Sequence, residues 1–333
     1  MAKKRATMTD VARLAGVTQA TVSYVINDSA HISEEVKAKV FQAIKELNYT
    51  PNFNARALKT NSSNIIGIIL PDIVNQYYSR MVEYLEELLI QRNHHTMVYT
   101  TSYNPDYERD IIQRLLSLDV SGIIVLYQFS DKSNWTLLKS SGKPIVALEG
   151  GEYCDEINIP CIRTDSYQAE YSATKYLLNS GAKKIAFIHQ TAVNESLYNR
   201  FLGYVQAMKD ANLFDSSDIY YFENTAEQKE ECERIGSLLS VLPYDAIIAS
   251  SDLIAVSLIR QLLIHGKKVP DDVRMIGYDN LPLASLFIPA LTTIAQPLEE
   301  ICKRIVEIIF VSENELPLIS TTFQTKLIIR DSA

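Results

Sequence analysis

The sequence lacks the features on which most enzyme and membrane-protein assignments depend. It has no glycine-rich phosphate loop, no Gly-x-Ser-x-Gly element and no His/Cys set at metal-ligand spacing. Its five histidines are scattered, and the adjacent pair His94-His95 would point in different directions at a helix end. No apolar run approaches the about 20 residues that a membrane span needs. These absences argue against catalysis, a bound metal, a cofactor or membrane insertion.

Cysteine is also scarce, and its placement bears on where the protein acts. The four cysteines, at positions 154, 161, 232 and 302, have no CxxC spacing and no evident disulfide framework. Packing of reduced thiols is therefore the default interpretation. The N-terminal MAKKRATM is basic, but no apolar segment follows it, unlike in a secretory signal. We expect a bacterial cytoplasmic protein with reduced thiols.

The overall composition is that of an ordinary globular protein. Hydrophobic residues make up 47% and charged residues 22% of the 333 positions, enough for two or three domains with substantial cores. The net charge of −8 is unevenly divided. Residues 1–60 hold nine Lys/Arg against five Asp/Glu, a net +4, which leaves −12 on the remainder. A mildly basic end on an acidic body suits a protein that presents one end to phosphates.

Residues 7–58 carry the most informative pattern, which begins with short helices in succession. Thr7 followed by Asp10 is typical of a capping box, with Asp where Glu or Gln is usual. The apolar residues that follow recur at helical spacing: Val11, Leu14 and Ala15. Gly16 permits a sharp turn at the end of this helix. A helix, a glycine-containing turn and a second helix form the unit that many DNA-binding proteins place in the major groove.

The second helix has an outward face suited to reading bases. Thr18 can cap it, and its inward face would be Val22, Val25 and Ile26; a third helix begins after Ser33. Glutamine can pair with adenine, alanine can contact a thymine methyl, and hydroxyls can reach base edges or phosphates. The pattern predicts a helix-turn-helix domain, and a three-helix bundle with a merely polar surface is the alternative. The outward residues are small or neutral, unlike an ordinary Glu/Lys solvent face: Gln19, Ala20, Ser23, Tyr24 and Asn27.

The motifs of this segment are specific. The run D-V-A-x-x-A-G-V-T-x-x-T-V-S-x-V-I-N is followed by I-S-x-x-V and Y-T-P-N-x-x-A-R-x-L. Together they closely resemble the headpiece of the LacI/GalR family of bacterial repressors. The resemblance implies that Gln19, Ala20 and Tyr24 read the DNA sequence, although Tyr24 stands where that family most often has Arg. His31 lies in a loop where some members touch DNA, with a solvated loop histidine as the alternative. The predicted headpiece contacts are Thr7, Thr18, Gln19, Ala20, Thr21, Ser23, Tyr24, Asn27 and His31.

Residues 52–59 resemble the hinge helix of that family, which orders on operator DNA. Leu58 matches the leucine that enters the minor groove, where an apolar wedge unstacks a base step and kinks the duplex. The alternative is that Leu58 packs beneath the linker. The predicted contacts of this segment are Asn52, Ala55, Arg56 and Leu58.

After residue 64, apolar runs alternate with longer helical patterns. Such alternation predicts parallel sheets that helices cover on both faces, with ligands bound at the carboxyl ends of the strands. The expected strands are Ile65–Leu70, Thr96–Thr101, Gly122–Leu126, Ile145–Leu148, Ile185–Ile188, Tyr220–Phe222, Ala246–Ala249 and Met275–Tyr278. The expected helices lie near 76–92, 106–118, 133–140, 166–180, 196–211, 226–241, 252–265 and 298–310. A division near residues 160–165 predicts two lobes.

The resemblance adds a chain path that periodicity alone does not give. It implies a small all-α helix-turn-helix headpiece plus an α/β periplasmic-binding-protein-like core of two doubly wound parallel-sheet lobes. The chain would cross between the lobes near 162–165, 292–295 and 321–326. The expected domains are residues 1–50 (DNA binding), 51–61 (hinge), 62–163 with 295–323 (N-terminal lobe) and 164–294 with 324–333 (C-terminal lobe). No leucine-heptad tail follows Asp331, so a homodimer is expected.

Strand ends of the first lobe supply one set of candidate effector contacts. Asp72, Asn75 and Tyr78 follow the first strand, where an amide and an aromatic ring can bind a hydroxyl and stack on a sugar or a base. Tyr127 and Glu149 also sit at strand ends, at positions that face the effector in the family. The alternatives are a core role for Tyr77 or Tyr78 and a solvated loop carboxylate at Glu149.

The second lobe supplies the other set. Arg200 begins an R-x-x-G motif, and Asp279 lies in Gly-Tyr-Asp-Asn; both match family residues that bind ligand hydroxyls. A structural Arg–Asp salt bridge is the alternative. Ser251, Asp252 and Gln296 complete the predicted set. The aromatic that closes the pocket in many relatives has no clear counterpart around residues 222–226.

These features favour a repressor of a carbohydrate-utilisation operon whose affinity for a pseudo-palindromic operator depends on a small molecule bound between the two lobes, with a sugar as the expected effector. Such a repressor would be associated with the nucleoid when it is bound to its operator. A solute receptor of a transporter shares the two lobes but not the DNA-binding head, and a sugar-modifying enzyme would need catalytic groups that are absent. A purine effector stays open. A phosphorylated carrier protein is disfavoured, because residues 79–84 and 288–290 hold no basic cluster.

Overall fold

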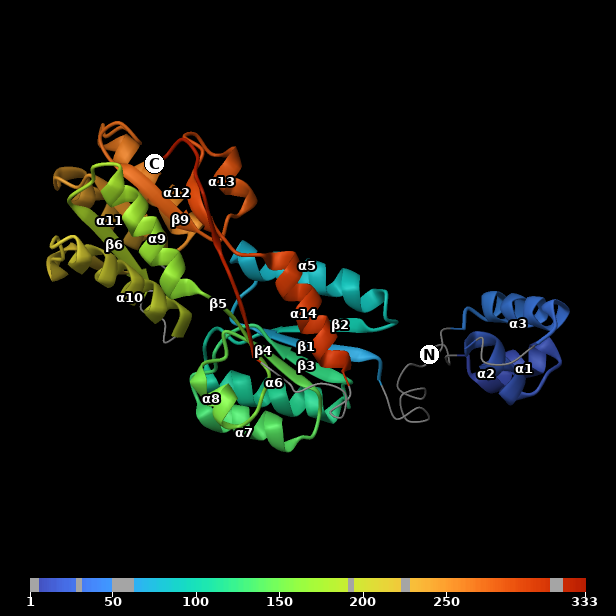
Figure 1. Ribbon diagram of the computed structural model, residues 1–333. Helices are drawn as coiled ribbons and strands as arrows, with labels where there is room; N and C mark the ends of the chain where they lie inside the picture. Colours follow the sequence, from blue (N-terminus) through green and yellow to red (C-terminus); the bar gives the residue numbers. More distant parts are fainter. Residues whose placement is uncertain (1–5, 28–31, 50–62, 191–194, 223–227, 312–319) are drawn as a thin grey trace. The chain divides into compact units, whose positions relative to one another are not determined.

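The computed structural model describes residues 6–27, 32–49, 63–190, 195–222, 228–311 and 320–333. The chain divides into two compact units, Met1–Ser63 and Asn64–Ala333, here called the headpiece and the core. The described elements of the headpiece are three helices (Figure 1): α1 (Met8–Ala15), α2 (Gln19–Asn27) and α3 (Glu34–Glu46).

The ends of α1 and α2 follow from their capping residues. Thr7 accepts a hydrogen bond from the backbone N–H of Asp10 at 3.3 Å, and the Asp10 carboxylate accepts one from the N–H of Thr7 at 3.0 Å, which confirms the capping box. Gly16 ends α1 with a φ of 67°, a left-handed conformation that glycine adopts without strain. Thr18 Oγ1 accepts the N–H of Thr21 at 3.1 Å and so caps α2 as predicted.

The three helices bury one small core. Val11, Val22 and Val40, one from each helix, are fully buried. Of the apolar residues that recur at helical spacing in α1, Leu14 is 50% exposed, and Ala12 is buried instead. Successive residues of a helix are turned by about 100°. Leu14 therefore lies beside Val11, but on the side of the helix opposite to Ala12. The buried stripe of α1 is therefore centred between Val11 and Ala12.

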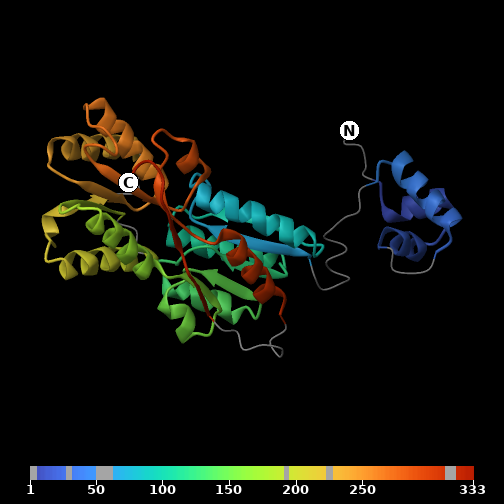
Figure 2. The same ribbon diagram turned by 45° about the horizontal axis from the view of Figure 1, so that its top comes forward.

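The core contains two lobes, each built around a six-stranded sheet (Figures 1 and 2). The sheet of the N-terminal lobe is parallel throughout, in the order β11-β5-β4-β3-β1-β2. Its strands are β1 (Ile65–Leu70), β2 (His95–Thr100), β3 (Gly122–Val125), β4 (Ile145–Leu148), β5 (Cys161–Thr164) and β11 (Thr321–Phe323). One face packs on α5 (Gln76–Ile90) and α14 (Leu298–Phe310), the other on α6 (Pro105–Ser117), α7 (Lys132–Ser140) and α8 (Glu152–Glu156).

The C-terminal lobe repeats this plan in the order β12-β10-β9-β8-β6-β7. Its strands are β6 (Ile185–Gln190), β7 (Ile219–Phe222), β8 (Ala246–Ala249), β9 (Arg274–Tyr278), β10 (Thr292–Ala295) and β12 (Lys326–Ile328). One face packs on α9 (Ser166–Asn179) and α10 (Glu195–Asp210), the other on α11 (Gln228–Val241), α12 (Asp252–Ile264) and α13 (Pro282–Leu286). Strand β12 is antiparallel to β10, the one departure from an all-parallel sheet among the described strands.

The chain passes between the lobes at three places in the described core. It leaves the first sheet after Thr164 and enters α9 at Ser166, returns between Ala295 and Leu298, and crosses again between Phe323 and Lys326 (Figure 1). The N–H of Asp165 donates to the carbonyl of Phe323 at 2.9 Å, so two of these passages run side by side. The predicted fold class of a helical headpiece and two doubly wound lobes is confirmed.

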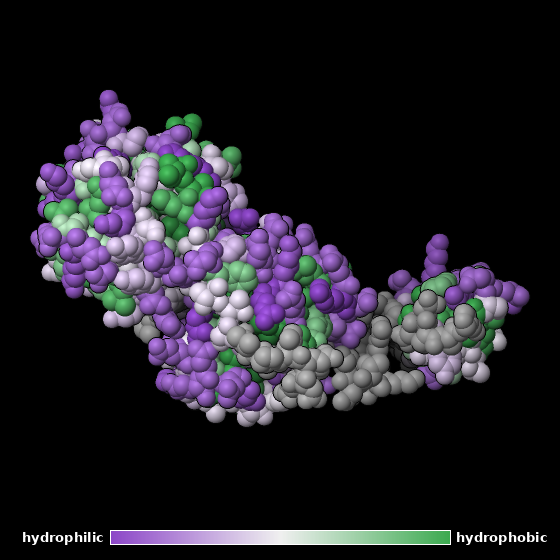
Figure 3. All heavy atoms as spheres, viewed as in Figure 1, coloured by the Kyte–Doolittle hydropathy of each residue, from purple (hydrophilic) through white to green (hydrophobic). Residues whose placement is uncertain are grey.

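The face drawn in Figure 3 is largely hydrophilic, with hydrophobic atoms reaching the surface in patches. This distribution follows from the apolar strands β1, β3, β4 and β8, whose residues are nearly all buried between helices. No helix in the described parts of the chain combines the length and apolar character needed to cross a membrane.

Candidate functional site

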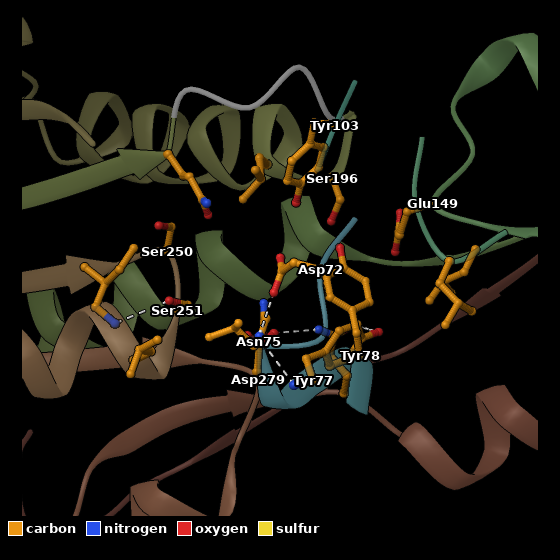
Figure 4. Close-up of a pocket in the computed structure, with 18 of the residues that line it drawn as sticks. Asp72, Asn75, Tyr77, Tyr78, Tyr103, Glu149, Ser196, Ser250, Ser251 and Asp279 are labelled. Carbon is orange, nitrogen blue, oxygen red and sulfur yellow. Dashed lines mark hydrogen bonds between the residues drawn. The ribbon is translucent and has the colours of Figure 1, made fainter. Parts of the chain in front are cut away.

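A cavity of about 500 Å³ lies in the core at the carboxyl ends of strands from both sheets. Figure 4 shows side chains of the two lobes directed into this shared space. Eight of the ten predicted effector contacts line it: Asp72, Asn75, Tyr78, Glu149, Arg200, Ser251, Asp279 and Gln296. The strand-end rule for parallel sheets therefore brings most of the predicted residues together.

A chain of hydrogen bonds connects the two lobes across the floor of the cavity. The Tyr77 hydroxyl donates to Gln296 Oε1 at 2.9 Å, and Gln296 Nε2 donates to Asp279 Oδ1 at 2.9 Å. Tyr77 lies in the first turn of α5 in the N-terminal lobe, whereas Asp279 follows β9 of the C-terminal lobe. Gln296, in the second passage between the lobes, fixes one oxygen of the aspartate. The other oxygen of Asp279 has capacity to accept a ligand hydroxyl.

Asp279 is held in an unusual state. Its φ is 103°, a left-handed conformation that side chains other than glycine adopt at a cost of about 1–3 kcal/mol. Its side chain is 7% exposed, and burial raises its pKa to about 6, against the opposing effects of Arg200 and Gln296. A strained, buried carboxylate in a cavity is typical of a binding site.

Arg200 approaches the cavity from α10 of the C-terminal lobe. Its Nη1 donates to the carbonyl oxygen of Ser250 at 2.9 Å, and its guanidinium carbon lies 3.4 Å from the centre of the Tyr278 ring. The side chain is 8% exposed, and its Nε finds no hydrogen-bond partner within the described residues. Ser250 Oγ, also in the lining, is unpartnered there as well. Buried donors without partners are costly, so this corner is suited to a polar ligand group.

Glu149, also in the lining, directly follows β4. Its Oε1 accepts hydrogen bonds from the N–H and the hydroxyl of Thr164, both at 2.8 Å, and burial raises its pKa. The hydroxyl chain continues from Thr164 to Ser166 at 3.1 Å and from Ser166 to Ser196 at 2.6 Å. It links a carboxylate of the first lobe to a hydroxyl of the second through the first passage between lobes.

Two predicted contacts, Tyr127 and Asp252, do not line the cavity. Tyr127 points to the other face of the sheet, where its hydroxyl bonds Thr101 at 2.5 Å and Glu108 at 2.9 Å. Asp252 is fully buried and accepts hydrogen bonds from the Leu281 N–H at 2.7 Å and the Thr293 hydroxyl at 2.5 Å. In each case the preceding residue occupies the cavity, because neighbouring side chains point in different directions.

The lining also contains residues that the sequence interpretation did not select. Leu126 and Ser250 directly follow a strand and Leu148 ends one, so the same strand-end rule could have found these three. Apart from Gln190, the others lie farther along a loop or in the first turn of a helix, and Tyr77 was considered only as a core aromatic. Gln190 was missed because β6 extends two residues beyond its expected end. The unpredicted lining residues are Val74, Tyr77, Ser102, Tyr103, Leu126, Leu148, Gln190, Ser196, Leu197, Ser250, Leu253 and Ile254.

The headpiece presents a second candidate site. Gln19 and Ala20 are exposed at the start of α2, Tyr24 is 47% exposed, and Thr21 and Ser23 are half-buried. Thr7 and Thr18 cap their helices and are exposed. Asn27 ends α2. Five predicted contacts lie outside the described residues: His31, Asn52, Ala55, Arg56 and Leu58.

Comparisons with known proteins match both parts of the chain. Residues 7–52 match the bacterial regulatory proteins of the lacI family, and residues 174–333 match a periplasmic binding protein-like domain. The HTH-type transcriptional repressor PurR of Mannheimia succiniciproducens is 30% identical over 98% of both chains. The ribose operon repressor of Halalkalibacterium halodurans is 31% identical, over 98% of this chain and 96% of the relative.

The fold has a close counterpart among solved structures. The lac repressor dimer bound to operator and the anti-inducer ONPF superposes with a TM-score of 0.82 over 99% of both chains, at 22% identity. Full-length relatives of 30% and 31% identity, together with the headpiece motif and the two-lobe core, identify the family. The chain belongs to the lacI family of bacterial regulatory proteins, and it is a DNA-binding transcriptional regulator with an effector-binding core, not an enzyme.

Proposed function

We propose that the protein is a cytoplasmic repressor of a carbohydrate-utilisation operon, which binds a pseudo-palindromic operator as a homodimer and responds to an uncharged sugar. The observation that carries the sugar assignment is the chemistry of the cavity. Among the lining residues that the structure describes, three are carboxylates, Asp72, Glu149 and Asp279, against the one guanidinium of Arg200. Carboxylates accept hydrogen bonds from hydroxyl groups, and an excess of them repels a phosphate or carboxylate ligand.

A purine is the second candidate, and the aromatic lining argues against it. A flat base is held best between parallel rings. The rings of Tyr77 and Tyr78 are 5.5 Å apart but inclined by 68°. Tyr103, the third tyrosine of the lining, makes an edge contact with Tyr127 at 86°. Neither of these two contacts offers a parallel pair of rings to a base, whereas a pyranose needs only one ring face and several hydroxyl partners.

A thermal-shift panel tests the effector class. We expect D-ribose, D-glucose or cellobiose to raise the Tm of the core, while hypoxanthine and inorganic phosphate leave it unchanged. A ligand at 100 times its Kd adds about 2.7 kcal/mol of stability. Stabilisation by hypoxanthine alone would reject the sugar assignment and leave the two-lobe binding site in place.

Arg200→Met should abolish the effect of the stabilising sugar on operator binding. The methionine preserves most of the buried volume but removes the donors that reach the cavity. Operator affinity without sugar should stay within about two-fold, since α10 belongs to the core and not to the headpiece. The matched control is Arg274→Met, because Arg274 donates to Ser180 away from the cavity. A normal sugar response in Arg200→Met would show that the cavity is not the effector site.

Gln19→Ala should weaken operator binding by about ten-fold, since a bidentate contact to a base contributes about 1–3 kcal/mol. Gln42→Ala is the matched control: Gln42 is exposed on α3, where its amide bonds Glu46 at 2.9 Å. Gel-shift titrations at several salt concentrations give both the affinities and the steep salt dependence expected of phosphate contacts. Equal affinities for the two variants would place base recognition elsewhere.

A further inference from the structure

The turn that follows β9 is held by side chains that lie outside the cavity. Asp279 and Asn280 are consecutive residues with positive φ, 103° and 50°. Asparagine adopts the left-handed region readily, but for Asp279 at 103° the backbone conformation is strained and persists only where the surroundings hold it. The turn nevertheless decides where the Asp279 carboxylate points. The groups that hold the turn therefore determine the geometry of the cavity.

Asp252 and Thr293 hold the turn through hydrogen bonds to its backbone. Asp252 Oδ2 accepts the N–H of Leu281 at 2.7 Å, and its Oδ1 accepts the Thr293 hydroxyl at 2.5 Å. Thr293 Oγ1 in turn accepts the N–H of Asn280 at 3.3 Å. The approach is close: a Cβ added to Gly277 would lie 2.4 Å from Asp252 Oδ1. These bonds satisfy both backbone donors that follow Asp279.

Arg330 secures the turn from the C-terminal segment. Its Nη2 donates to Asn280 Oδ1 and its Nη1 to the carbonyl oxygen of Leu291, each at 2.7 Å. A guanidinium suits this role because its planar fork can serve two acceptors at once. Arg330 comes two residues after β12, the strand that the chain enters from its third passage between the lobes. The residue thus ties the last crossing segment to the cavity turn.

We propose that Arg330 is a positioning residue for Asp279: with Asp252 and Thr293 it holds the left-handed turn that directs the carboxylate into the effector cavity. The proposal rests on the proposed function only in naming the cavity as the effector site. It also gives Asp252 a role that its position in the sequence did not reveal. Asp252 acts through the turn and makes no contact with the ligand.

Crystal structures of variants test the positioning without any ligand. In Arg330→Met we expect Asp279 to leave its left-handed conformation and to lose the hydrogen bond from Gln296 Nε2. Arg330→Lys keeps the charge but cannot bridge the Asn280 side chain and the Leu291 carbonyl oxygen, so it should give the same change. It replaces Arg330→Met in the experiment if the methionine variant does not fold. Arg274→Met, the control, should keep the turn. An unchanged turn in the arginine-330 variants overturns the proposal.

A double-mutant cycle with D-ribose and cellobiose tests the consequence for binding. Arg330→Met should weaken binding of the stabilising sugar by ten-fold or more, and operator affinity without sugar should not change. In an Asp279→Asn background the same substitution should cost less than two-fold, because its effect is transmitted through that carboxylate. Equal losses in both backgrounds would indicate general destabilisation and refute the positioning role. If none of D-ribose, D-glucose and cellobiose binds the unmodified protein, the sugar assignment fails, while the crystal structures still decide the role of Arg330.

Discussion

Replacing Gly203 with alanine should lower the free energy of unfolding of the core by about 2–4 kcal/mol. In most helices this substitution stabilises, since alanine has the better helix propensity by about 1 kcal/mol. Here Gly203 lies on α10 where it crosses α9. An added Cβ would sit 2.3 Å from the carbonyl oxygen of Tyr167 and 2.9 Å from the backbone N of Tyr171. Backbone atoms cannot rotate away, so the two helices must separate.

The same separation would reach the cavity. Arg200 lies three residues before Gly203 on α10 and is buried against Ser250 and Tyr278. Displacement of α10 should therefore weaken sugar binding as well as stability. Urea unfolding followed by circular dichroism measures the first effect, with Lys209→Ala on the exposed side of α10 as the control. Stability equal to or above that of the unmodified protein would show that α9 and α10 are not in this close contact.

Elements buried on both sides were predictable from the sequence. The run Ile65–Leu70 forms β1 with the predicted ends, because a strand covered by helices on both faces must be apolar throughout. Strand β5 was not predicted as a strand. Its four residues, Cys161–Thr164, include the polar Arg163 and Thr164, and its place in the sheet depends on pairing with β4 and β11. Such long-range pairing leaves no mark in local periodicity.

For the candidate site, too, the sequence predicts the location but not the direction of each side chain. The strand-end rule placed eight of the ten predicted contacts correctly in the lining, yet it selected Tyr127 where Leu126 lines the cavity, and of the predicted pair Ser251 and Asp252 only Ser251 lines it. A shift of one residue reverses the face on which a side chain lies. The sequence can predict where a strand ends, but the direction of each side chain there depends on the pleat of the strand and on the first turn of the next helix. The roles of Arg330 and Gly203 depend on contacts between distant segments, which only the fold supplies.

Glu170→Gln should stabilise the core at neutral pH and should remove the part of the pH dependence of its stability that comes from this carboxyl group. Glu170 lies on α9, its side chain is 1% exposed, and its Oε1 has no hydrogen-bond partner among the described residues. Burial raises its pKa from the ordinary 4.5 to about 8, although the charge of Arg200 opposes the shift. The folded state thus holds this proton more tightly than the unfolded chain. Stability from this group is greatest below pH 4.5 and is lost as the pH rises to about 8.

Glutamine is neutral at every pH and keeps the shape of the protonated acid. Each unit of pKa difference corresponds to about 1.4 kcal/mol, so the gain near pH 7.5 should be on the order of 3 kcal/mol. The expected result is a higher Tm for Glu170→Gln at pH 7.5 and a gap that narrows as the pH falls toward 4.5. Glu230→Gln, on the exposed surface of α11, should change neither. A difference in Tm that stays constant across this pH range would mean that Glu170 is ionised in the folded protein at pH 7.5. Arg200 would then have to neutralise the Glu170 carboxylate as well as bind a ligand in the cavity.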